Sequence, residues 1–356
     1  MNVDATTPLI PVTLLTGFLG SGKTTVLNHL VQQPELSDAL VIINEFGEMA
    51  LDHLLIAHST ENVVEQMSSG CLCCTIRGDL VKTLRDITWR FSREGERQFG
   101  RVLIETTGLA DPAPIIHTLM TDHYIASRYR LDGIVTVVDL AVGSDTLDRH
   151  NEAIKQAAMA DTLLLSKSDL TTSENRIALM QRLDAINPSA TRHTVLAGQV
   201  SSTHVLDLGL FSTRSKTPDV ERWLREEDYA TVHGHGHHHH VHDVNRHDDH
   251  IRAFCFSLSE PIPEEVLFEW LETLMDFVGS RILRIKGVLN VAGRAQPLVL
   301  HGVQHIFYPP VPLPAWPSED RRSRLVFITQ DVDRDFIERT FDAFREIMPQ
   351  AWEISA

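Results

Sequence analysis

The sequence predicts an α/β fold with a mostly parallel sheet, then a His-rich linker, then a small α+β domain. Three observations support this prediction. Apolar runs alternate with helical patterns through the first 200 residues, and a Gly-rich turn separates the first run from the first helix. A stretch poor in apolar residues follows, before a second region with regular patterns begins.

Short apolar runs predict the strands of the first domain, because near-continuous apolar runs are typical of a sheet covered on both faces. These runs lie at 11–17, 39–45, 101–107, 133–139, 162–167 and 193–198. Helical patterns lie between them, at 23–32, 79–94, 151–160 and 174–186. This alternation is typical of βαβ units.

The pattern changes between about 210 and 250, where apolar residues are too few to form a core. Beyond it, 251–259 alternates like a strand, and 263–279 is an amphipathic helix with Pro263 near its start and Gly279 at its end. Three further strands and a helix at 333–346 follow. We therefore expect three parts: 1–210, a linker at 211–250, and an α+β domain at 251–356.

Composition excludes several classes of protein. The chain has 356 residues, is 43% hydrophobic and carries a formal net charge of −16, which argues against nucleic-acid binding. The N-terminus has Asp4 and no basic segment, and no stretch approaches the roughly 18 apolar residues of a membrane span. Three of the four cysteines are clustered, unlike a secreted disulfide framework. We expect a cytoplasmic protein with no membrane or nucleic-acid partner.

The segment "GFLGSGKTT" at 17–25 fits the phosphate-binding pattern G-x-x-x-x-G-K-[ST], and it lies between a predicted strand and a predicted helix. Its glycines let backbone N–H groups surround phosphates at a helix N-terminus. Lys23 would reach the β- and γ-phosphates, and the Thr24 hydroxyl would bind Mg²⁺. The residues expected to bind nucleotide here are Gly17, Gly20, Ser21, Gly22, Lys23, Thr24 and Thr25.

A second strand end would complete this site. In "VLIETTG", Glu105 closes an apolar run and Gly108 follows three residues later. We expect Glu105 to contact Mg²⁺ through water and Gly108 to offer its backbone N–H to the γ-phosphate. The alternative is that Glu105 only ends a strand. Asp139, at the end of another apolar run, is a weaker candidate with a structural role as the alternative.

The base-recognition candidates are Lys167 and Asp169 in "SKSD". A carboxylate can accept from both guanine N1–H and the exocyclic amine, and adenine lacks this donor pair. Lys167 would lay its stem over the base. The usual guanine motif begins with Asn, where this chain has Ser166, and surface charge at a strand end is the alternative.

Cys71, Cys73 and Cys74 lie within four positions in "GCLCC". Thiolates favour Zn²⁺ and similar ions, and three sulfurs fall short of the four ligands of a closed structural zinc site. An incomplete set suits metal transfer. A disulfide and a redox-sensing thiol remain alternatives. Cys255 lies among apolar residues and is expected to pack in a core.

Together, the motifs resemble the CobW/YjiA-type metal-handling P-loop GTPases. The resemblance rests on "GFLGSGKTT", "NEFGE" at 44–48, "GCLCC" at 70–74, "ETTGLADP" at 105–112, "SKSD" at 166–169 and "LRIKGVLN" at 283–290. It implies a GTPase that binds zinc, or in some members cobalt or another transition metal, and delivers it to client proteins. It also implies Glu48 as a further metal ligand. Many relatives carry an acid where this chain has Ile43, so that second carboxylate is missing here.

The histidine-rich tract is the last candidate metal site. Imidazoles bind Zn²⁺, Co²⁺, Ni²⁺ and Cu²⁺, and Asp243, Asp248 and Asp249 are interspersed. We interpret the tract as a metal-collecting arm, with a low-complexity linker or a tag as alternatives. The candidate ligands are His235, His237, His238, His239, His240 and His242.

These residues lead to one hypothesis. A GTPase using GTP, Mg²⁺ and Zn²⁺ would hold zinc at the cysteines and transfer it to a client metalloprotein when GTP is hydrolysed. Alternatives are a metal buffer regulated by nucleotide, a cobalt-handling GTPase, and a P-loop kinase. A homo-oligomer that depends on nucleotide or metal is a further expectation. Because no water-positioning Gln follows Gly108, we expect slow intrinsic hydrolysis.

Overall fold

The computed structural model describes residues 8–44, 64–66, 72–76, 80–93, 96–208, 250–308 and 310–355. The chain forms two compact units, each described by itself below. The first comprises Met1–Val142, Ala160–Thr172 and Thr191–Gly209. The second comprises Gly143–Met159, Ser173–Ala190 and Leu210–Ala356.

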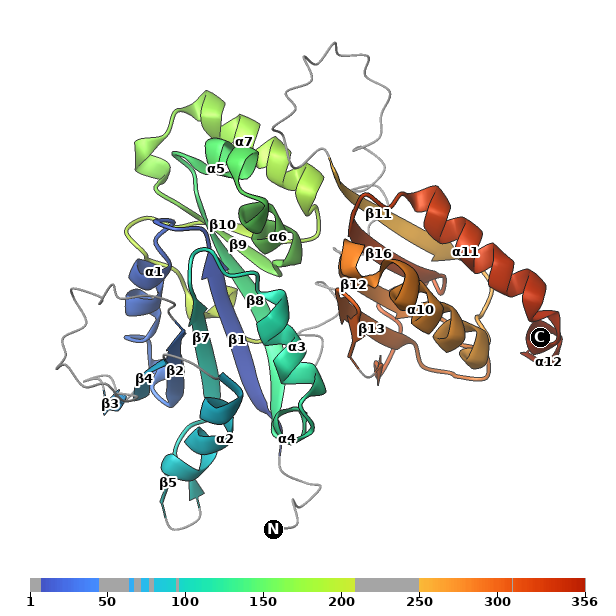
Figure 1. Ribbon diagram of the computed structural model, residues 1–356, viewed down its shortest axis with the longest axis horizontal. Helices are drawn as coiled ribbons and strands as arrows, with labels where there is room; N and C mark the ends of the chain where they lie inside the picture. Colours follow the sequence, from blue (N-terminus) through green and yellow to red (C-terminus); the bar gives the residue numbers. More distant parts are fainter. Residues whose placement is uncertain are drawn as a thin grey trace. The chain divides into compact units, whose positions relative to one another are not determined.

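The first unit is built on a mostly parallel sheet (Figure 1). Its strands run in the order β10 (Thr191–Thr194), β9 (Thr162–Ser166), β8 (Tyr129–Asp139), β1 (Ile10–Gly17), β7 (Arg101–Thr106), β2 (Ala39–Asn44), β4 (Leu72–Ile76) and β3 (Val64–Gln66). Only the β3–β4 pairing is antiparallel. A ligand site is expected at the carboxyl end of β1, because the chain order reverses on either side of this strand.

Helices cover both faces of this sheet. α1 (Lys23–Leu30) packs its buried face, Val26, Leu27 and Leu30, against Leu15 and other core residues of the strands. α3 (Ala113–Thr121) packs against β8, and Figure 1 shows it on the side opposite α1. The other elements of this unit are η1 (Pro34–Leu36), α2 (Leu80–Arg90), β5 (Ser92–Arg93), β6 (Glu96–Arg97), α4 (His123–Ala126), η2 (Ser168–Leu170) and η3 (Ser202–His204).

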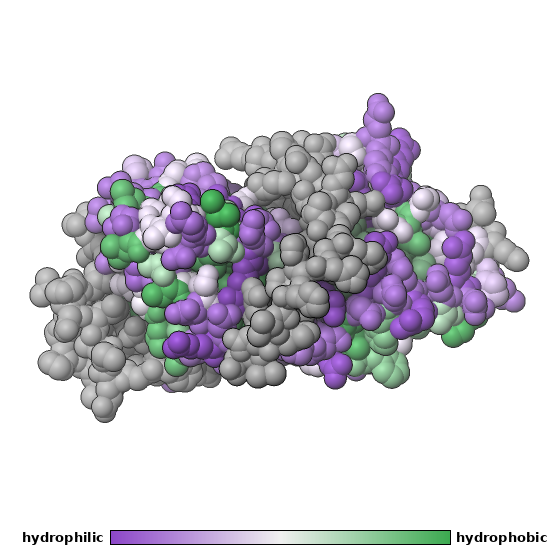
Figure 2. All heavy atoms as spheres, turned by 90° about the horizontal axis from the view of Figure 1, so that it is seen from above, coloured by the Kyte–Doolittle hydropathy of each residue, from purple (hydrophilic) through white to green (hydrophobic). Residues whose placement is uncertain are grey.

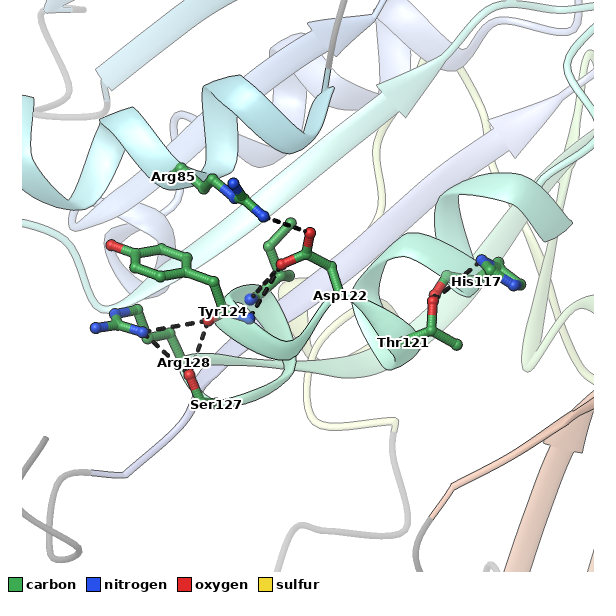
Figure 3. Close-up of polar contacts among 8 residues, drawn as sticks. Arg85, His117, Thr121, Asp122, Tyr124, Ser127 and Arg128 are labelled. Carbon is green, nitrogen blue, oxygen red and sulfur yellow. Dashed lines mark hydrogen bonds and ion pairs between the residues drawn. The ribbon is translucent and has the colours of Figure 1, made fainter.

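Polar contacts join α2 to α4 (Figure 3). Arg85 pairs with Asp122 at 2.7 Å, and Asp122 caps α4 by accepting from the backbone N–H groups of Tyr124 and Ile125. These backbone hydrogen bonds lower the pKa of Asp122, as does Arg85. The guanidinium of Arg128 lies 3.7 Å from the centre of the Tyr124 ring. The Arg85–Asp122 pair thus joins α2, which follows β4 along the chain, to the start of α4.

The second unit holds α5 (Gly143–Arg149), α6 (Asn151–Met159) and α7 (Ser173–Ile186) together with the C-terminal sheet. That antiparallel sheet has the order β11 (Ile251–Leu258), β16 (Ser323–Gln330), β12 (Ile282–Leu289), β13 (Leu298–Val303) and β14 (Ile306–Phe307), and β15 (Val311–Pro312) pairs with β13. The remaining elements are α10 (Glu264–Val278), η6 (Gly279–Arg281), α11 (Arg334–Ile347) and α12 (Pro349–Ser355).

α10 and α11 pack side by side over a shared apolar core. Trp270 is fully buried between them, with its ring 5.0 Å from that of Phe341. Its indole N–H donates to the Thr340 hydroxyl, so the buried polar atom is satisfied. Cys255 is buried in β11, as the sequence predicted.

The α/β fold class with an α+β C-terminal domain is confirmed. Within the described residues, most predicted strands and helices appear within a few residues of their expected bounds. Two predictions were wrong. Three strands were predicted after the helix at 263–279, but the described part of the chain has five, because the chain turns at Gln304 (φ 51°) between β13 and β14 and the short β15 pairs with β13. The run 193–198 was predicted as a strand, but β10 ends at Thr194. Ala197 and Gly198 have φ of 50° and 79°, so the chain turns there and cannot continue as a strand.

Candidate nucleotide site

The turn after β1 is shaped by close packing of Gly17. Its φ is 139°, and a Cβ built on it would lie 2.3 Å from the carbonyl oxygen of Val137 in β8. A side chain at this position would force β1 and β8 apart. The turn then leads into α1 through Gly22, which has a left-handed conformation at the helix N-cap. The "GFLGSGKTT" segment therefore forms the predicted loop at a helix N-terminus.

Lys23 and Ser21 face the inside of this loop. Lys23 is 8% exposed, and its Nζ donates to the carbonyl oxygens of Gly17 at 2.9 Å and Phe18 at 3.2 Å. The Ser21 hydroxyl is buried and makes no hydrogen bond within the described part of the chain. A buried hydroxyl without a partner is costly in an apolar setting and fits a site whose ligand supplies oxygen atoms. The loop therefore suits a polyphosphate.

Thr24 and Glu105 lie in contact although they are far apart in sequence. The Thr24 hydroxyl donates to Glu105 Oε1 at 2.8 Å, and Glu105 is 5% exposed. Next to them, the Thr106 hydroxyl donates to that of Thr16 at 2.8 Å, which ties the end of β7 to the end of β1. A hydroxyl beside a carboxylate is an oxygen pair of the kind that Mg²⁺ prefers.

Gly108 lies directly against the phosphate loop. A Cβ built on it would be 2.6 Å from the backbone nitrogen of Leu19. Only glycine permits this approach, so the backbone that follows β7 borders the loop. Asp111 then accepts from the backbone N–H of Ala113 at 2.9 Å and caps the start of α3.

Ser166, the first residue of "SKSD", lies at the end of β9 and contacts the phosphate loop. The Ser166 hydroxyl donates to the carbonyl oxygen of Ser21 at 2.7 Å, so it ties this strand end to the phosphate loop. Lys167 has a left-handed φ of 55°, and its Nζ lies 2.6 Å from Asp139 Oδ2. Asp139 therefore orients Lys167. This is a structural role, the alternative that the sequence left open for Asp139. Asp169 is exposed at the same edge of the sheet.

The loop 195–200 is a part of the site that sequence reasoning missed. A Cβ on Gly198 would lie 2.6 Å from the carbonyl oxygen of Thr25 in α1. Leu196 and Gln199 form an isolated bridge that closes the turn. The Ala197–Gly198 dipeptide was the available signal, because glycine permits a tight turn. The loop thus packs against the helix that begins the phosphate site.

Most of the predicted metal ligands lie outside the described residues: Glu48, Cys71 and the histidines from His235 to His242. For Cys73 and Cys74 the structure describes the backbone alone. It pairs Cys73 with Val41 and Cys74 with Ile42, so β4 joins the sheet beside β2. β2 pairs with β7, where Ile43 lies opposite Glu105. The strand with the cysteines thus belongs to the same sheet as the phosphate loop, with β2 and β7 between them.

The fold and this site define a P-loop nucleotide-binding protein. Residues 11–194 match the family described as "CobW/HypB/UreG, nucleotide-binding domain", and residues 251–345 match "Cobalamin synthesis protein cobW C-terminal domain". The chain therefore belongs to the CobW family of P-loop GTPases.

Individual relatives agree with this assignment. Zinc chaperone YjiA of Escherichia coli is 32% identical over 338 residues, which cover 95% of this chain and 99% of that protein. Zinc-regulated GTPase metalloprotein activator 1 of Schizosaccharomyces pombe is 29% identical and covers 85% of this chain and 77% of its own length. The crystal structure of Zn(II)-bound YjiA GTPase from E. coli has a TM-score of 0.71 and 30% identity, and covers 95% of this chain and 100% of its own. None of the helices in the described ranges has the length and the apolar character of a membrane-spanning segment.

Proposed function

We propose that this GTPase is a zinc chaperone that binds Zn²⁺ at Cys71, Cys73 and Cys74 and transfers it to a client metalloprotein when GTP is hydrolysed. One observation carries the proposal: β4, which holds two of these cysteines, extends the sheet that carries the phosphate loop. The names of the relatives, zinc chaperone and zinc-regulated GTPase metalloprotein activator, support zinc as the cargo.

The nucleotide side of the proposal assigns a role to each residue. Lys23 neutralises charge on the β- and γ-phosphates, and Gly108 offers its backbone N–H to the γ-phosphate. Asp169 accepts two hydrogen bonds from guanine, and Lys167, held by Asp139, covers the base. The Thr24–Glu105 pair holds Mg²⁺, which supplies charge neutralisation on the phosphates when bound.

The proposed zinc site is argued from the ligand chemistry of its residues. Three thiolates leave room for a ligand from the chain, such as Glu48, or from a client. The histidines between 235 and 242 collect metal for this site. Co²⁺ is accepted by the same ligand types, so the cellular metal follows from availability as well as affinity. We also propose the division 1–210, 211–250 and 251–356, a cytoplasmic location, and a homo-oligomer that forms with nucleotide or metal.

Coupling between the two sites makes the proposal testable. The segments 44–48 and 105–112 respond to the γ-phosphate as switch segments do, and the cysteine loop lies between them in the sequence. We expect zinc to bind more tightly with a nonhydrolysable GTP analogue than with GDP, and by linkage zinc changes the affinity for GTP by the same factor.

The test is a competition titration of Zn²⁺ against a fluorescent chelator with each nucleotide present. The Cys73→Ser variant should lose most of the affinity in both states, and Cys255→Ser, a buried cysteine of the second unit, is the matched control. Equal zinc affinity with both nucleotides would refute the coupling and favour a metal buffer. Wild-type affinity in Cys73→Ser would refute the site.

A further inference from the structure

The C-terminal domain has a cavity of about 300 Å³ beside α10. Leu271 and Met275 of α10, Leu300 of β13 and Phe307 of β14 line it. The first three of these belong to the buried core that α10 and α11 share, and Phe307 packs against that core. The floor of the cavity is therefore held by the fold and exists before any ligand binds.

The side of the cavity rim that α10 forms is acidic, and His305, which lies outside α10, also lines the cavity. Glu272 and Asp276 line it, and they lie one helical turn apart on α10. α10 contains five carboxylates and neither Lys nor Arg. Glu264 pairs with Arg294 at 2.8 Å, but Glu265, Glu269, Glu272 and Asp276 make no ion pair within the described ranges of the chain.

This arrangement is unfavourable in the isolated domain. Like charges three or four residues apart on a helix repel each other. Asp276 also lies in the last turn of α10, where the helix dipole disfavours a negative charge. A cationic partner would relieve both effects.

Exposed aromatic side chains accompany the acidic rim. Phe268 lines the cavity and is 37% exposed, and Phe277, next to Asp276, is 79% exposed. Figure 2 shows apolar patches bordered by hydrophilic ones on the surface of the C-terminal elements, at the right of the view. An apolar patch with a charged border is typical of a protein-interaction site.

We propose that this cavity docks a segment of a partner protein that carries a large apolar side chain flanked by Lys or Arg. The apolar side chain fills the cavity over Met275, and the basic residues pair with Glu272 and Asp276. The acidic rim selects against nucleic acid and against acidic segments, because both carry the same sign of charge. The proposal concerns the second unit alone and does not depend on nucleotide or zinc.

The test follows the methyl resonance of Met275 in full-length protein labelled at the methionine methyl groups, assigned with Met275→Leu. The probe is the peptide GSKRFLKRGS. Control peptides are GSKRGGKRGS, which has the charge without the apolar pair, and GSEEFLEEGS, which has the apolar pair with reversed charge. We expect the first peptide to shift the resonance with saturation and the controls to shift it at least tenfold more weakly.

Matched double variants locate the site. Glu272→Lys with Asp276→Lys should weaken binding of the first peptide at least tenfold. Asp342→Lys with Glu346→Lys, which makes the same charge change on exposed positions of α11, should leave it within twofold. Equal effects of the two double variants, or equal binding of all three peptides, would overturn the proposal. The peptide comparison stands by itself if a variant fails to fold. Zinc and nucleotide are absent from this assay, so its failure leaves the chaperone proposal intact.

Discussion

The phosphate loop and the α10 cavity are two sites built in different ways. The loop is one continuous segment that buries two polar residues, Ser21 at 2% exposed and Lys23 at 8% exposed. The cavity takes its walls from α10, β13 and β14 and exposes its charges on a helix surface. The phosphate loop can therefore be found as a local sequence motif, whereas the cavity forms only when α10, β13 and β14 come together in the folded domain.

This difference matters for how each site can change. The loop depends on backbone geometry, since a Cβ on Gly17 would collide with Val137. The charged rim of the cavity, Glu272 and Asp276, consists of exposed side chains, which other residues could replace without disturbing the core. The contrast suggests that the chemistry is fixed by the loop and that partner choice is set by surfaces such as α10.

The strongest test of this contrast is Lys23→Ala. We expect GTP hydrolysis to fall by about 10²-fold or more, because the variant loses the cation that stabilises charge on the phosphates. It also loses the hydrogen bonds from Nζ to Gly17 and Phe18 that hold the loop. Single-turnover phosphate release at saturating GTP measures the effect.

Two controls test whether the effect of Lys23→Ala is specific to the phosphate loop. Lys82→Ala removes an exposed lysine of α2 and should leave hydrolysis unchanged. Binding of the basic peptide to the α10 cavity should be the same in Lys23→Ala and in the wild type. If the lysine variant hydrolysed GTP at the normal rate, the loop would not be the catalytic centre.

A smaller effect is expected for Asp169→Asn, which tests base selection. The carboxylate would accept hydrogen bonds from both guanine donors, N1–H and the exocyclic amine. The amide of Asn has one acceptor oxygen, and its NH₂ group would face the second guanine donor without forming a hydrogen bond. We expect the preference for GTP over ATP to fall roughly 10- to 100-fold, as expected for losing a charged hydrogen bond. Xanthosine triphosphate, which has a carbonyl where guanine has its amine, should bind Asp169→Asn better than the wild type.

Competition binding with the three nucleotides measures this change. Asp145→Asn makes the same substitution at an exposed position of α5 and should alter none of the affinities. An unchanged GTP preference in Asp169→Asn would mean that the base lies elsewhere, with the loop 195–200 as the next candidate.

The parts of the nucleotide site that could be predicted from sequence are those with a local pattern. Lys23 and Thr24 follow from the loop motif, and Glu105 and Gly108 follow from a strand end. Ser166 differs from the usual Asn, and only the structure shows that its hydroxyl binds the carbonyl of Ser21. Its role depends on a contact between residues 145 positions apart, which no local pattern encodes.

The misplaced strand at 193–198 shows the limit of apolar runs. The segment "HTVLAG" looks like a strand by its β-branched and apolar residues, but Ala197 and Gly198 turn the chain toward Thr25. The α10 helix was predicted almost to its bounds, yet its cavity was not. Leu300 and Phe307, which close that cavity, lie in other elements and become neighbours of Met275 only through folding.

The smallest expected effect concerns Asp132, a residue without a motif in the sheet that carries the phosphate loop. It lies near the start of β8, where the register with β1 shifts between Val12 and Thr13. It is 0% exposed and accepts from the backbone N–H of Asp207 at 2.7 Å, while Arg130 lies at 3.3 Å. Burial raises the pKa of Asp132, although the nearby arginines oppose the shift.

The sign of the pH effect follows from that direction. Because the folded-state pKa lies above the unfolded one, ionising Asp132 costs more in the folded protein. Its contribution to the free energy of unfolding therefore falls as pH rises from the ordinary pKa of an aspartate through the raised one. Asp132→Asn keeps an acceptor for the Asp207 N–H but cannot ionise. Urea unfolding at a series of pH values should show the free energy of the wild type falling relative to that of Asp132→Asn over this window. Parallel curves for the two proteins would contradict a raised pKa and would mean that the arginines offset the effect of burial.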